Sequence, residues 1–245
     1  MKAIAFVGFK KSGKTSALEK VANELKNRGY KIAIAKSMHT NFDNKNTDTW
    51  KFKQIADYVI VRAQETDALL FEAKDINALF SIIPEVDFLL LEGFKTARHM
   101  PKIICAKSEE EVDALNDDLA IAISGIIANN RIHQIKGLPV INALENPEKL
   151  ADLIEEKAFM LPNLDCRMCG LTCYEMSKSI IRGEKSIKDC VVISSKPQVV
   201  VKVDGKELPM KDWVQELVKK TIEGMLSAMK GYKEGRKIEI IITNK

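Results

Sequence analysis

Short apolar segments alternate with amphipathic ones along residues 1–160. Ala3–Val7 is uniformly apolar and is followed by Gly8, which predicts a buried β-strand. From Thr15 to Arg28 the apolar residues recur at helical spacing, and Gly29 ends the run. Further strands are expected at Ile32–Ala35, Tyr58–Arg62, Ala68–Phe71, Asp87–Leu91, Ile103–Ala106, Ala120–Ser124 and Pro139–Asn142, and further helices at Trp50–Ala56, Asp75–Ile82, Glu109–Leu115 and Pro147–Phe159. Apolar strands separated by helices indicate an α/β fold with a mostly parallel sheet, buried on both faces.

The pattern changes twice after residue 160. Residues 161–191 hold four of the five cysteines and one short amphipathic segment through Met176 and Ile180. We therefore expect an α/β domain over 1–160, a small four-cysteine module over 161–191 and a short α+β unit over 192–245. The last unit should have a ββαβ order, built from a strand at Val199–Val203, a turn at Asp204-Gly205, a return strand from Glu207, a helix at Trp213–Met229 and a closing strand at Ile238–Ile242.

Composition and charge exclude several classes of protein. The chain of 245 residues is 46% apolar and 29% charged, which is typical of a packed globular protein. Its net charge of +4 is spread along the chain rather than gathered in basic blocks, which gives no support for nucleic-acid binding. No apolar run approaches the roughly 20 residues of a membrane span, and the first strand leads into a glycine loop rather than a signal-peptide cleavage site. We expect a cytoplasmic protein that binds neither nucleic acid nor a membrane.

The segment Gly8-Phe9-Lys10-Lys11-Ser12-Gly13-Lys14-Thr15 matches the phosphate-loop pattern G-x-x-x-x-G-K-[ST] between an expected strand and an expected helix. Its glycines let backbone N–H groups turn inward around phosphates, and the helix adds its positive dipole end. Lys14 would reach the β- and γ-phosphates, and the Thr15 hydroxyl would ligate Mg²⁺. The alternative is a glycine turn that only joins strand to helix. The expected phosphate-binding residues are Gly8, Lys10, Lys11, Ser12, Gly13, Lys14, Thr15 and Ser16.

A second acid is needed to hold the metal ion. The apolar run Phe88–Leu91 carries Asp87 at one end and Glu92 at the other. Ligands of open α/β sheets bind at the carboxyl ends of strands, which selects Glu92. Asp87 would lie about 16 Å away at the rise of a strand. Glu92 would alternatively only cap a turn, and Asp48, in a polar loop, is a further candidate for the shell of the metal ion or of the attacking water. Lys14, Asp48 and Glu92 are the candidate catalytic residues, with Thr15 and Glu92 on the metal.

With these motifs in place, the sequence from Met1 to about Lys107 resembles the molybdopterin-guanine dinucleotide biosynthesis protein B (MobB) family. The residues that carry the resemblance are the phosphate loop, Lys36-Ser37-Met38-His39 with Asp43, Thr47-Asp48-Thr49-Trp50, and Leu91-Glu92-Gly93-Phe94-Lys95.

The resemblance implies a homodimeric GTP-binding protein with slow GTPase activity. Such a protein would assist molybdopterin guanylyltransferase, which attaches GMP to molybdopterin and forms the guanine dinucleotide of molybdenum and tungsten enzymes. Carried over by position, Asp48 and Glu92 would lie at the metal and the attacking water, and His39 and Lys95 would line the mouth of the site. The implied partners are the guanylyltransferase or a molybdenum or tungsten enzyme, together with molybdopterin. The preference for guanine rests on the resemblance alone.

Cys166, Cys169, Cys173 and Cys190 form a four-thiol set with no histidine nearby. Such a set suits a [4Fe–4S] cluster or a structural zinc ion. The segment is similar to a small iron–sulfur domain of electron-transfer and corrinoid proteins, which favours the [4Fe–4S] cluster for redox sensing or partner docking. Zinc and unligated thiols are the alternatives. Cys105 has apolar neighbours and is expected in the core.

The sequence thus predicts a GTP-binding assembly factor that carries an iron–sulfur module. Two alternatives stay open. One is a nucleotide-switched iron–sulfur scaffold or carrier, and the other is a P-loop small-molecule kinase. A kinase needs an arginine-rich lid over the phosphates, whereas only Arg62, Arg98 and Arg131 are available outside the first helix of the α/β domain.

Overall fold

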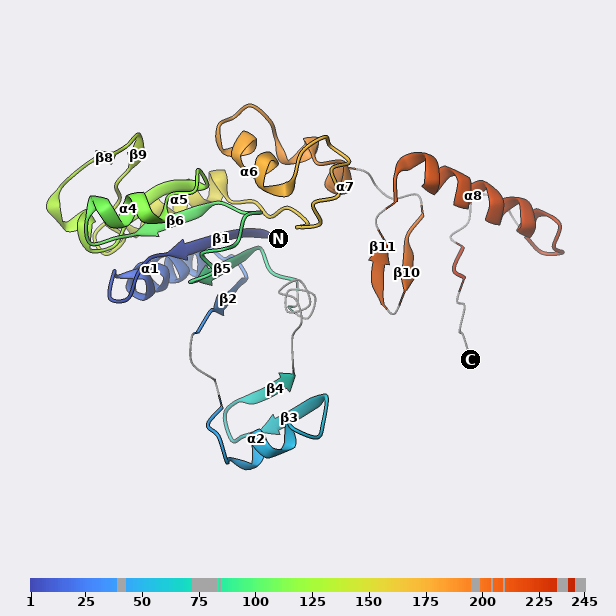
Figure 1. Cartoon of the computed structure of the whole chain (residues 1–245), viewed down its shortest axis with the longest axis horizontal. Helices are drawn as coiled ribbons and strands as arrows, with labels where there is room; N and C mark the ends of the chain where they lie inside the picture. Colours follow the sequence, from blue (N-terminus) through green and yellow to red (C-terminus); the bar gives the residue numbers. More distant parts are fainter. Residues whose placement is uncertain are drawn as a thin grey trace.

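A five-stranded parallel sheet organises the first half of the chain (Figure 1). The computed structural model describes residues 1–38, 43–71, 83, 85–194, 199–203, 205–208, 210–232 and 238–240. All neighbouring strands run parallel, so their carboxyl ends lie at one edge. The strand order is β2 (Ile32–Lys36), β5 (Phe88–Glu92), β1 (Lys2–Val7), β6 (Lys102–Cys105) and β7 (Ala120–Ser124). The predicted α/β fold with a mostly parallel sheet is confirmed.

Helices cover both faces of this sheet. Phe6 and Leu90 pack against α1 and α5 on one face, whereas Ala5 and Leu91 pack with Val112 of α4 on the other. Because successive strand residues point to opposite faces, strands buried on both sides have to be apolar throughout. The helices of this region are α1 (Lys14–Asn27), α4 (Glu109–Leu115), the 3-10 helix η1 (Ile126–Asn130) and α5 (Pro147–Lys157).

Smaller elements follow the last strand of the sheet. The strand expected at Pro139–Asn142 is instead a short antiparallel pair, β8 (Gln134–Ile135) with β9 (Leu138–Pro139), and a single parallel bridge from Val140 to Ile123. The cysteine module contains α6 (Cys173–Ile181), the 3-10 helix η2 (Ile187–Asp189) and α7 (Val191–Ser194).

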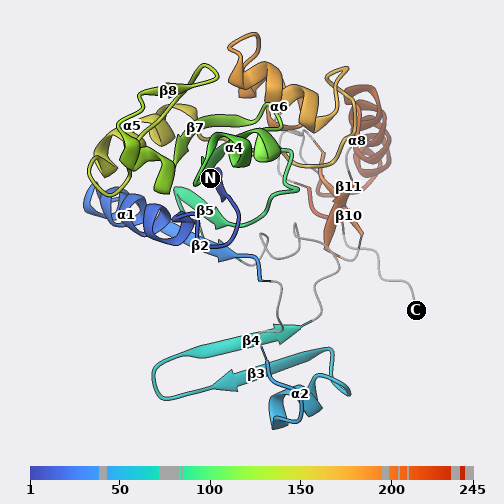
Figure 2. The ribbon, with the colours of Figure 1, turned by 60° about the vertical axis from the view of Figure 1, so that its left-hand side comes forward.

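The strands β3 (Tyr58–Arg62) and β4 (Asp67–Phe71) form an antiparallel hairpin outside the central sheet. Together with α2 (Asp48–Phe52) the hairpin lies away from the sheet in both ribbon views (Figures 1 and 2). The sequence predicted both strands but not their place. The connection between them is too short for the crossover that a parallel pair requires, which accounts for the antiparallel pairing. The helix expected at Asp75–Ile82 lies outside the described residues.

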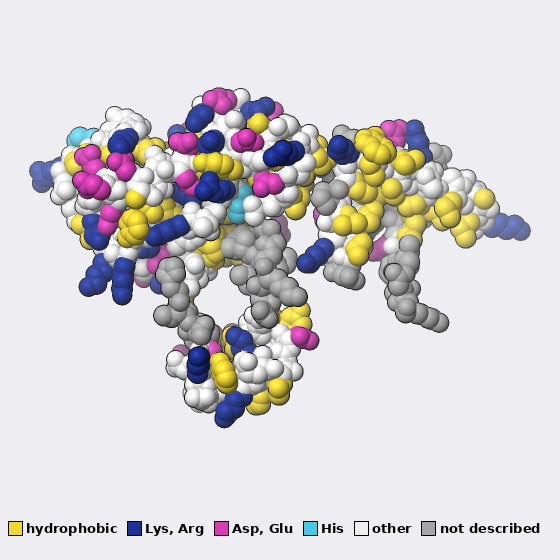
Figure 3. Space-filling view, in the orientation of Figure 1, with side chains coloured by type: hydrophobic (Ala, Val, Ile, Leu, Met, Phe, Trp, Pro, Cys, Tyr) yellow, Lys and Arg dark blue, Asp and Glu magenta, His cyan; other side chains and the backbone are white. Residues whose placement is uncertain are grey.

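The C-terminal unit contains β10 (Val201–Val203), paired antiparallel with β11 (Lys206–Leu208), and the helix α8 (Asp212–Ser227). Hydrophobic side chains are exposed over this unit (Figure 3), with Trp213 65% and Met225 71% exposed. Residues 238–240 of the expected closing strand are in no strand, and the rest of that strand and Asp204 of the expected turn lie outside the described residues. Among the helices that the structure describes, none is long and apolar enough to cross a lipid bilayer.

Cys105, at the end of β6, gives a test of the core. The residue is fully buried, and burial raises the pKa of its thiol to about 12. Because the thiolate is the reactive form, only about one Cys105 in 10⁴ would be ionised at pH 8. We expect Cys105 to resist iodoacetamide in the native protein and to react after unfolding, as measured by peptide mass spectrometry. Half-exposed Cys166 is the control in metal-free protein, and equal native labelling of the two would contradict the buried placement.

Gly125, directly after β7, gives a test of the close packing at the sheet edge. Its φ is 85°, and a Cβ on it would lie 2.3 Å from the carbonyl oxygen of Ser12. We expect Gly125→Ala to lower the free energy of unfolding by about 1–3 kcal/mol through overpacking, in addition to backbone strain. Gly137→Ala is the matched control, since its φ is 80° but, apart from its chain neighbours, no atom of the described residues lies within 4 Å of its Cβ. If chemical denaturation shows the same loss of unfolding free energy in Gly125→Ala and Gly137→Ala, the close contact at Gly125 does not contribute to stability.

Candidate functional site

The phosphate loop, residues 8–15, joins the carboxyl end of β1 to the start of α1. A Cβ on Gly8 would lie 2.3 Å from the Cys105 carbonyl oxygen and 2.4 Å from Ser12 Oγ. Gly13 precedes the helix with a φ of 87°, a conformation that other residues rarely adopt. Glycine is therefore required at both fixed positions of the motif for reasons of space and of backbone geometry.

Polar atoms of this loop suit a bound anion. Ser12 is fully buried, and its Oγ has no hydrogen-bond partner among the described residues. Lys14 Nζ donates to the Phe9 carbonyl oxygen at 2.6 Å. Burial lowers the pKa of Lys14, while the nearby Glu92 carboxylate opposes that shift. A phosphate oxygen in place of the Phe9 carbonyl would favour the charged ammonium, so the residues present fit a phosphate chain.

Thr15 and Glu92, which the sequence assigns to one magnesium ion, lie together. The Thr15 hydroxyl donates to Glu92 Oε1 at 2.9 Å. Lys36 Nζ lies 3.2 Å from Glu92 Oε2, because the ends of β2 and β5 are paired in register. Hydroxyl and carboxylate oxygens are ligands that Mg²⁺ uses, and the pair fits such an ion. Lys36 was not among the site residues predicted from the sequence, although a lysine that ends an apolar parallel strand already indicated a place at this edge. At the opposite edge, Asp87 Oδ2 accepts a hydrogen bond from the Lys31 N–H at 2.8 Å.

The segment after Glu92 folds back over the phosphate loop. Gly93 has a φ of 104°, and a Cβ on it would lie 3.1 Å from Ser37 Cβ. Lys95 Nζ lies 4.1 Å from the centroid of the Phe9 ring, within cation–π range. Of the two residues that the resemblance places at the mouth of the site, Lys95 therefore lies beside the loop, and His39 is outside the described residues.

Asp48 does not contact the phosphate loop. It begins α2 with its side chain 84% exposed, and its carboxylate pairs with Lys51 Nζ at 3.5 Å. The helix α2 belongs to the hairpin unit that Figures 1 and 2 place away from the sheet. A role for Asp48 at the metal or the attacking water requires this unit to approach the loop, and it stays a prediction.

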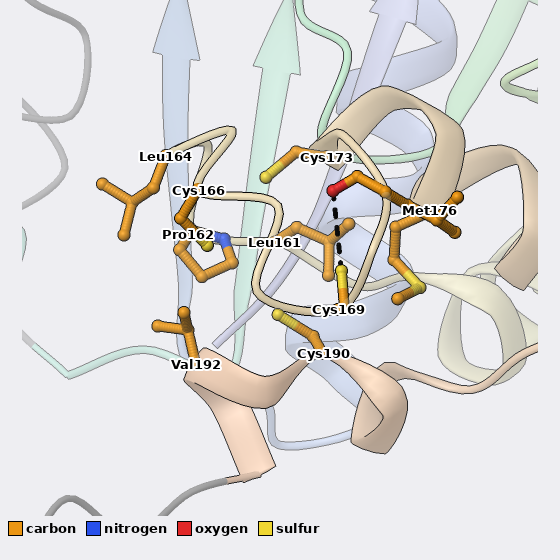
Figure 4. Close-up of a pocket in the computed structure, with 10 residues that line it drawn as sticks. Leu161, Pro162, Leu164, Cys166, Cys169, Cys173, Met176, Cys190 and Val192 are labelled. Atoms are coloured by element: carbon orange, nitrogen blue, oxygen red, sulfur yellow. Dashed lines mark hydrogen bonds between the residues drawn. The ribbon is translucent and has the colours of Figure 1, made fainter. Parts of the chain in front are cut away.

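Four cysteines line one small apolar cavity beside the α/β domain (Figure 4). Cys166, Cys169 and Cys173 come from the loop before α6 and from its first residue, whereas Cys190 follows η2. Their sulfur atoms surround a common space in the close-up. The apolar residues around them are Leu161, Pro162, Leu164, Leu171, Met176 and Val192.

Local hydrogen bonds hold the segments that carry these thiols. Thr172 and Glu175 form a capping box at the start of α6, where the Thr172 hydroxyl accepts the Glu175 N–H. The backbone N–H of Cys173 donates to Asp165 Oδ1 at 2.7 Å. Burial raises the pKa of the Cys173 thiol above its usual value. Burial thus favours the neutral thiol, whereas metal binding would favour the thiolate, because the thiolate is the form that binds a metal.

The donor chemistry of the cavity fits a thiolate-bound metal centre. None of the four cysteines is in a disulfide, and no histidine or carboxylate of the described residues lines the cavity. Over the described part of the chain, no three cysteine, histidine, aspartate or glutamate side chains are arranged as ligands of one ion, so the thiols would have to draw closer on binding. Four thiolates in an apolar shell are a donor set used by both [4Fe–4S] clusters and structural zinc.

Comparison with known families matches both parts of this arrangement. The family model described as "Molybdopterin guanine dinucleotide synthesis protein B" (MobB) matches residues 3–127, which include the phosphate loop and Glu92. A second model, described as "Putative Fe-S cluster", matches residues 161–192, which include all four clustered cysteines.

Individual relatives agree with the family models. A protein of Methanocaldococcus jannaschii described as "Putative molybdopterin-guanine dinucleotide biosynthesis adapter protein" is 29% identical over 99% of this chain and 97% of its own length. A "Probable molybdopterin-guanine dinucleotide biosynthesis adapter protein" of Bacillus subtilis is 30% identical over 57% of this chain and 84% of its own length.

Solved structures share the fold. A crystal structure of molybdopterin-guanine biosynthesis protein B has a TM-score of 0.50 at 20% identity, and covers 63% of this chain and 98% of its own. The Bacillus subtilis MobB structure has a TM-score of 0.50 at 23% identity, and covers 64% of this chain and 98% of its own. With its phosphate loop, its strand-end glutamate and a family match over half of its length, the chain belongs to the MobB family.

Proposed function

We propose that this protein is a guanine-nucleotide-binding adapter of molybdopterin-guanine dinucleotide biosynthesis with slow GTPase activity. The observation that carries the proposal is the 2.9 Å hydrogen bond between Thr15 Oγ1 and Glu92 Oε1 beside a complete phosphate loop. It brings together the two oxygen donors that a magnesium–nucleotide complex needs at this edge of the sheet. The pathway is supported by relatives that are described as adapters of that biosynthesis.

The chain's own groups would bind and orient the triphosphate. Backbone N–H groups of residues 8–15 and the start of α1 would hold the phosphates, and Lys14 would exchange the Phe9 carbonyl for phosphate oxygens. Thr15 and Glu92 would hold Mg²⁺, which neutralises phosphate charge when bound. Lys95 adds positive charge beside the loop. Asp48 would lie at the metal and the attacking water, and His39 would line the mouth of the site, as the family resemblance implies.

The four clustered cysteines would hold a [4Fe–4S] cluster, with zinc as the lesser alternative. Such a cluster supplies a one-electron redox centre when bound, and we propose redox sensing or partner docking as its role. The proposed partners are molybdopterin guanylyltransferase or a molybdenum or tungsten enzyme, together with molybdopterin. We further propose that the protein acts as a homodimer in the cytoplasm.

A second candidate function is a nucleotide-switched scaffold that delivers its cluster to an acceptor. It is favoured by the partial exposure of Cys166, Cys169 and Cys173, because a transferable cluster has to be reachable. The kinase alternative has less support. Arg62 lies on β3, and the Arg98 guanidinium lies on the Tyr174 ring, so neither forms a lid over the phosphates.

Lys14→Ala tests the phosphate loop. Loss of the charge-assisted hydrogen bonds to phosphate should weaken Mg·GTP binding by about 10- to 100-fold, as measured by calorimetry. Lys20→Ala is the matched control, because Lys20 is an exposed lysine of the same helix. Equal affinities of the two variants would argue against phosphate binding at this loop.

Iron and sulfide analysis tests the cysteine module. Anaerobically purified protein should contain about four iron atoms and four sulfides per chain, with a broad absorption shoulder near ~400 nm. Cys166→Ser should lose most of this content, whereas Cys105→Ala, which changes a cysteine outside the module, should keep it. One zinc ion per chain without sulfide would reject the redox role and leave a structural clip.

A further inference from the structure

Residues 93–101 form the crossover that links the two candidate sites. They lead from the end of β5 to the start of β6, on the two sides of β1, where Glu92 pairs with Phe6 and Lys102 pairs with Ala5. Its first part lies at the phosphate loop, where Glu92 accepts the Thr15 hydroxyl and Lys95 lies over Phe9. This part of the crossover therefore belongs to the surroundings of the phosphate loop.

The second part of the crossover lies against the cysteine module. The N–H of Leu161 donates to the His99 carbonyl oxygen at 2.8 Å. The Arg98 guanidinium lies 4.7 Å from the centroid of the Tyr174 ring, and Tyr174 follows Cys173 directly. An open cavity of about 340 Å³, lined by Arg98, Asp165 and Tyr174 among others, separates the two segments elsewhere and leaves room for them to move.

A buried lysine joins the first part of the crossover to Asp117, which Tyr174 of the module contacts. Lys102, with its side chain 1% exposed, donates through Nζ to the Lys95 carbonyl oxygen at 2.7 Å and to Asp117 Oδ2 at 2.6 Å. The Tyr174 hydroxyl donates to the backbone carbonyl oxygen of Asp117 at 2.9 Å. Because an unpaired buried ammonium is costly, Lys102 holds the backbone at Lys95 and the chain at Asp117 in a fixed relation. A continuous set of contacts thus runs from Lys95 to Tyr174 and its neighbour Cys173.

We propose that nucleotide binding at the phosphate loop and metal binding at the four cysteines are thermodynamically coupled through this crossover, with Tyr174 as the positioning residue. The inference rests on the proposed function, because it requires both ligands. Closure of the thiols on a metal moves Cys173 and, with it, Tyr174. The contacts through Asp117 and Lys102 carry that movement to Lys95 and hold the crossover against the phosphate loop. Metal-loaded protein therefore binds Mg·nucleotide more tightly, and nucleotide strengthens metal binding by the same factor.

The test compares nucleotide affinity with and without the metal. Anaerobically purified protein is divided, one half is stripped with a chelator, and both halves are titrated with a fluorescent, non-hydrolysable GTP analogue and Mg²⁺. We expect binding to the metal-loaded half to be at least about fivefold tighter, within the usual range of coupling between sites. Tyr174→Phe keeps the ring against Arg98 but removes the hydroxyl. In this variant the difference in nucleotide affinity between metal-loaded and metal-free protein should fall below about twofold, while both ligands still bind. Tyr58→Phe, at an exposed tyrosine of β3, is the matched control.

The possible outcomes separate the coupling from the function beneath it. Equal nucleotide affinities of the metal-loaded and the stripped wild-type protein would overturn the coupling and leave the proposed function standing. Absence of metal from the purified protein, or of nucleotide binding, would reject the proposed function and the coupling with it. Where Tyr174→Phe does not fold, Arg98→Gln replaces it. If the folded variant keeps the wild-type ratio of nucleotide affinities between metal-loaded and metal-free protein, the path through Tyr174 is overturned. Unchanged hydrogen exchange of residues 161–176 when nucleotide is added would overturn it as well.

Discussion

The chemistry of this protein depends on how closely the phosphate loop packs against the carboxyl ends of β6 and β7. Gly8 lies against the Cys105 carbonyl and Gly125 against the Ser12 carbonyl, at separations that leave no room for a Cβ. These contacts fix the course of the loop without a ligand, so little ordering of its backbone is left for nucleotide binding. The same packing aims the start of α1 at the sheet edge, which is how the Thr15 hydroxyl reaches the carboxylate of Glu92.

The features that could be predicted from the sequence are those that depend on residues close together in the chain. The phosphate loop is recognisable from a motif of eight consecutive residues. The place of Glu92 at the site is predicted by the rule that ligands bind at the carboxyl ends of parallel strands. The four-cysteine set is visible in its spacing in the same way. All three depend on residues that are near one another in the chain.

Features that depend on distant pairings could not be predicted in the same way. The position of Lys36 beside Glu92 follows from the register of β2 on β5, and the close approach of Gly125 to Ser12 follows from the strand order. The hydrogen bond from Tyr174 to Asp117 joins residues 57 positions apart. For β3 and β4 the short apolar runs predicted strands, but not that the two strands pair with each other in a hairpin outside the central sheet.

The comparisons divide the chain into a shared core and an addition. The two MobB structures are covered almost completely yet match only 63% and 64% of this chain. The relative from Methanocaldococcus jannaschii matches 99% of it. The similarity to this relative therefore extends over the cysteine module as well as the α/β domain. The contacts between Tyr174, Asp117 and Lys102 give this fusion a physical basis, because they bring the module into contact with the segment that leaves Glu92.

Calorimetric titration of the wild-type protein would show whether the phosphate loop and Glu92 form a magnesium–guanine nucleotide site. Mg·GTP, Mg·ATP and GTP with excess EDTA would be titrated in turn under the same conditions. We expect one nucleotide per chain, with Mg·GTP bound at least about tenfold more tightly than Mg·ATP and than GTP without the metal. Equal affinity for Mg·GTP and Mg·ATP, or affinity that does not change when Mg²⁺ is withdrawn, would contradict it.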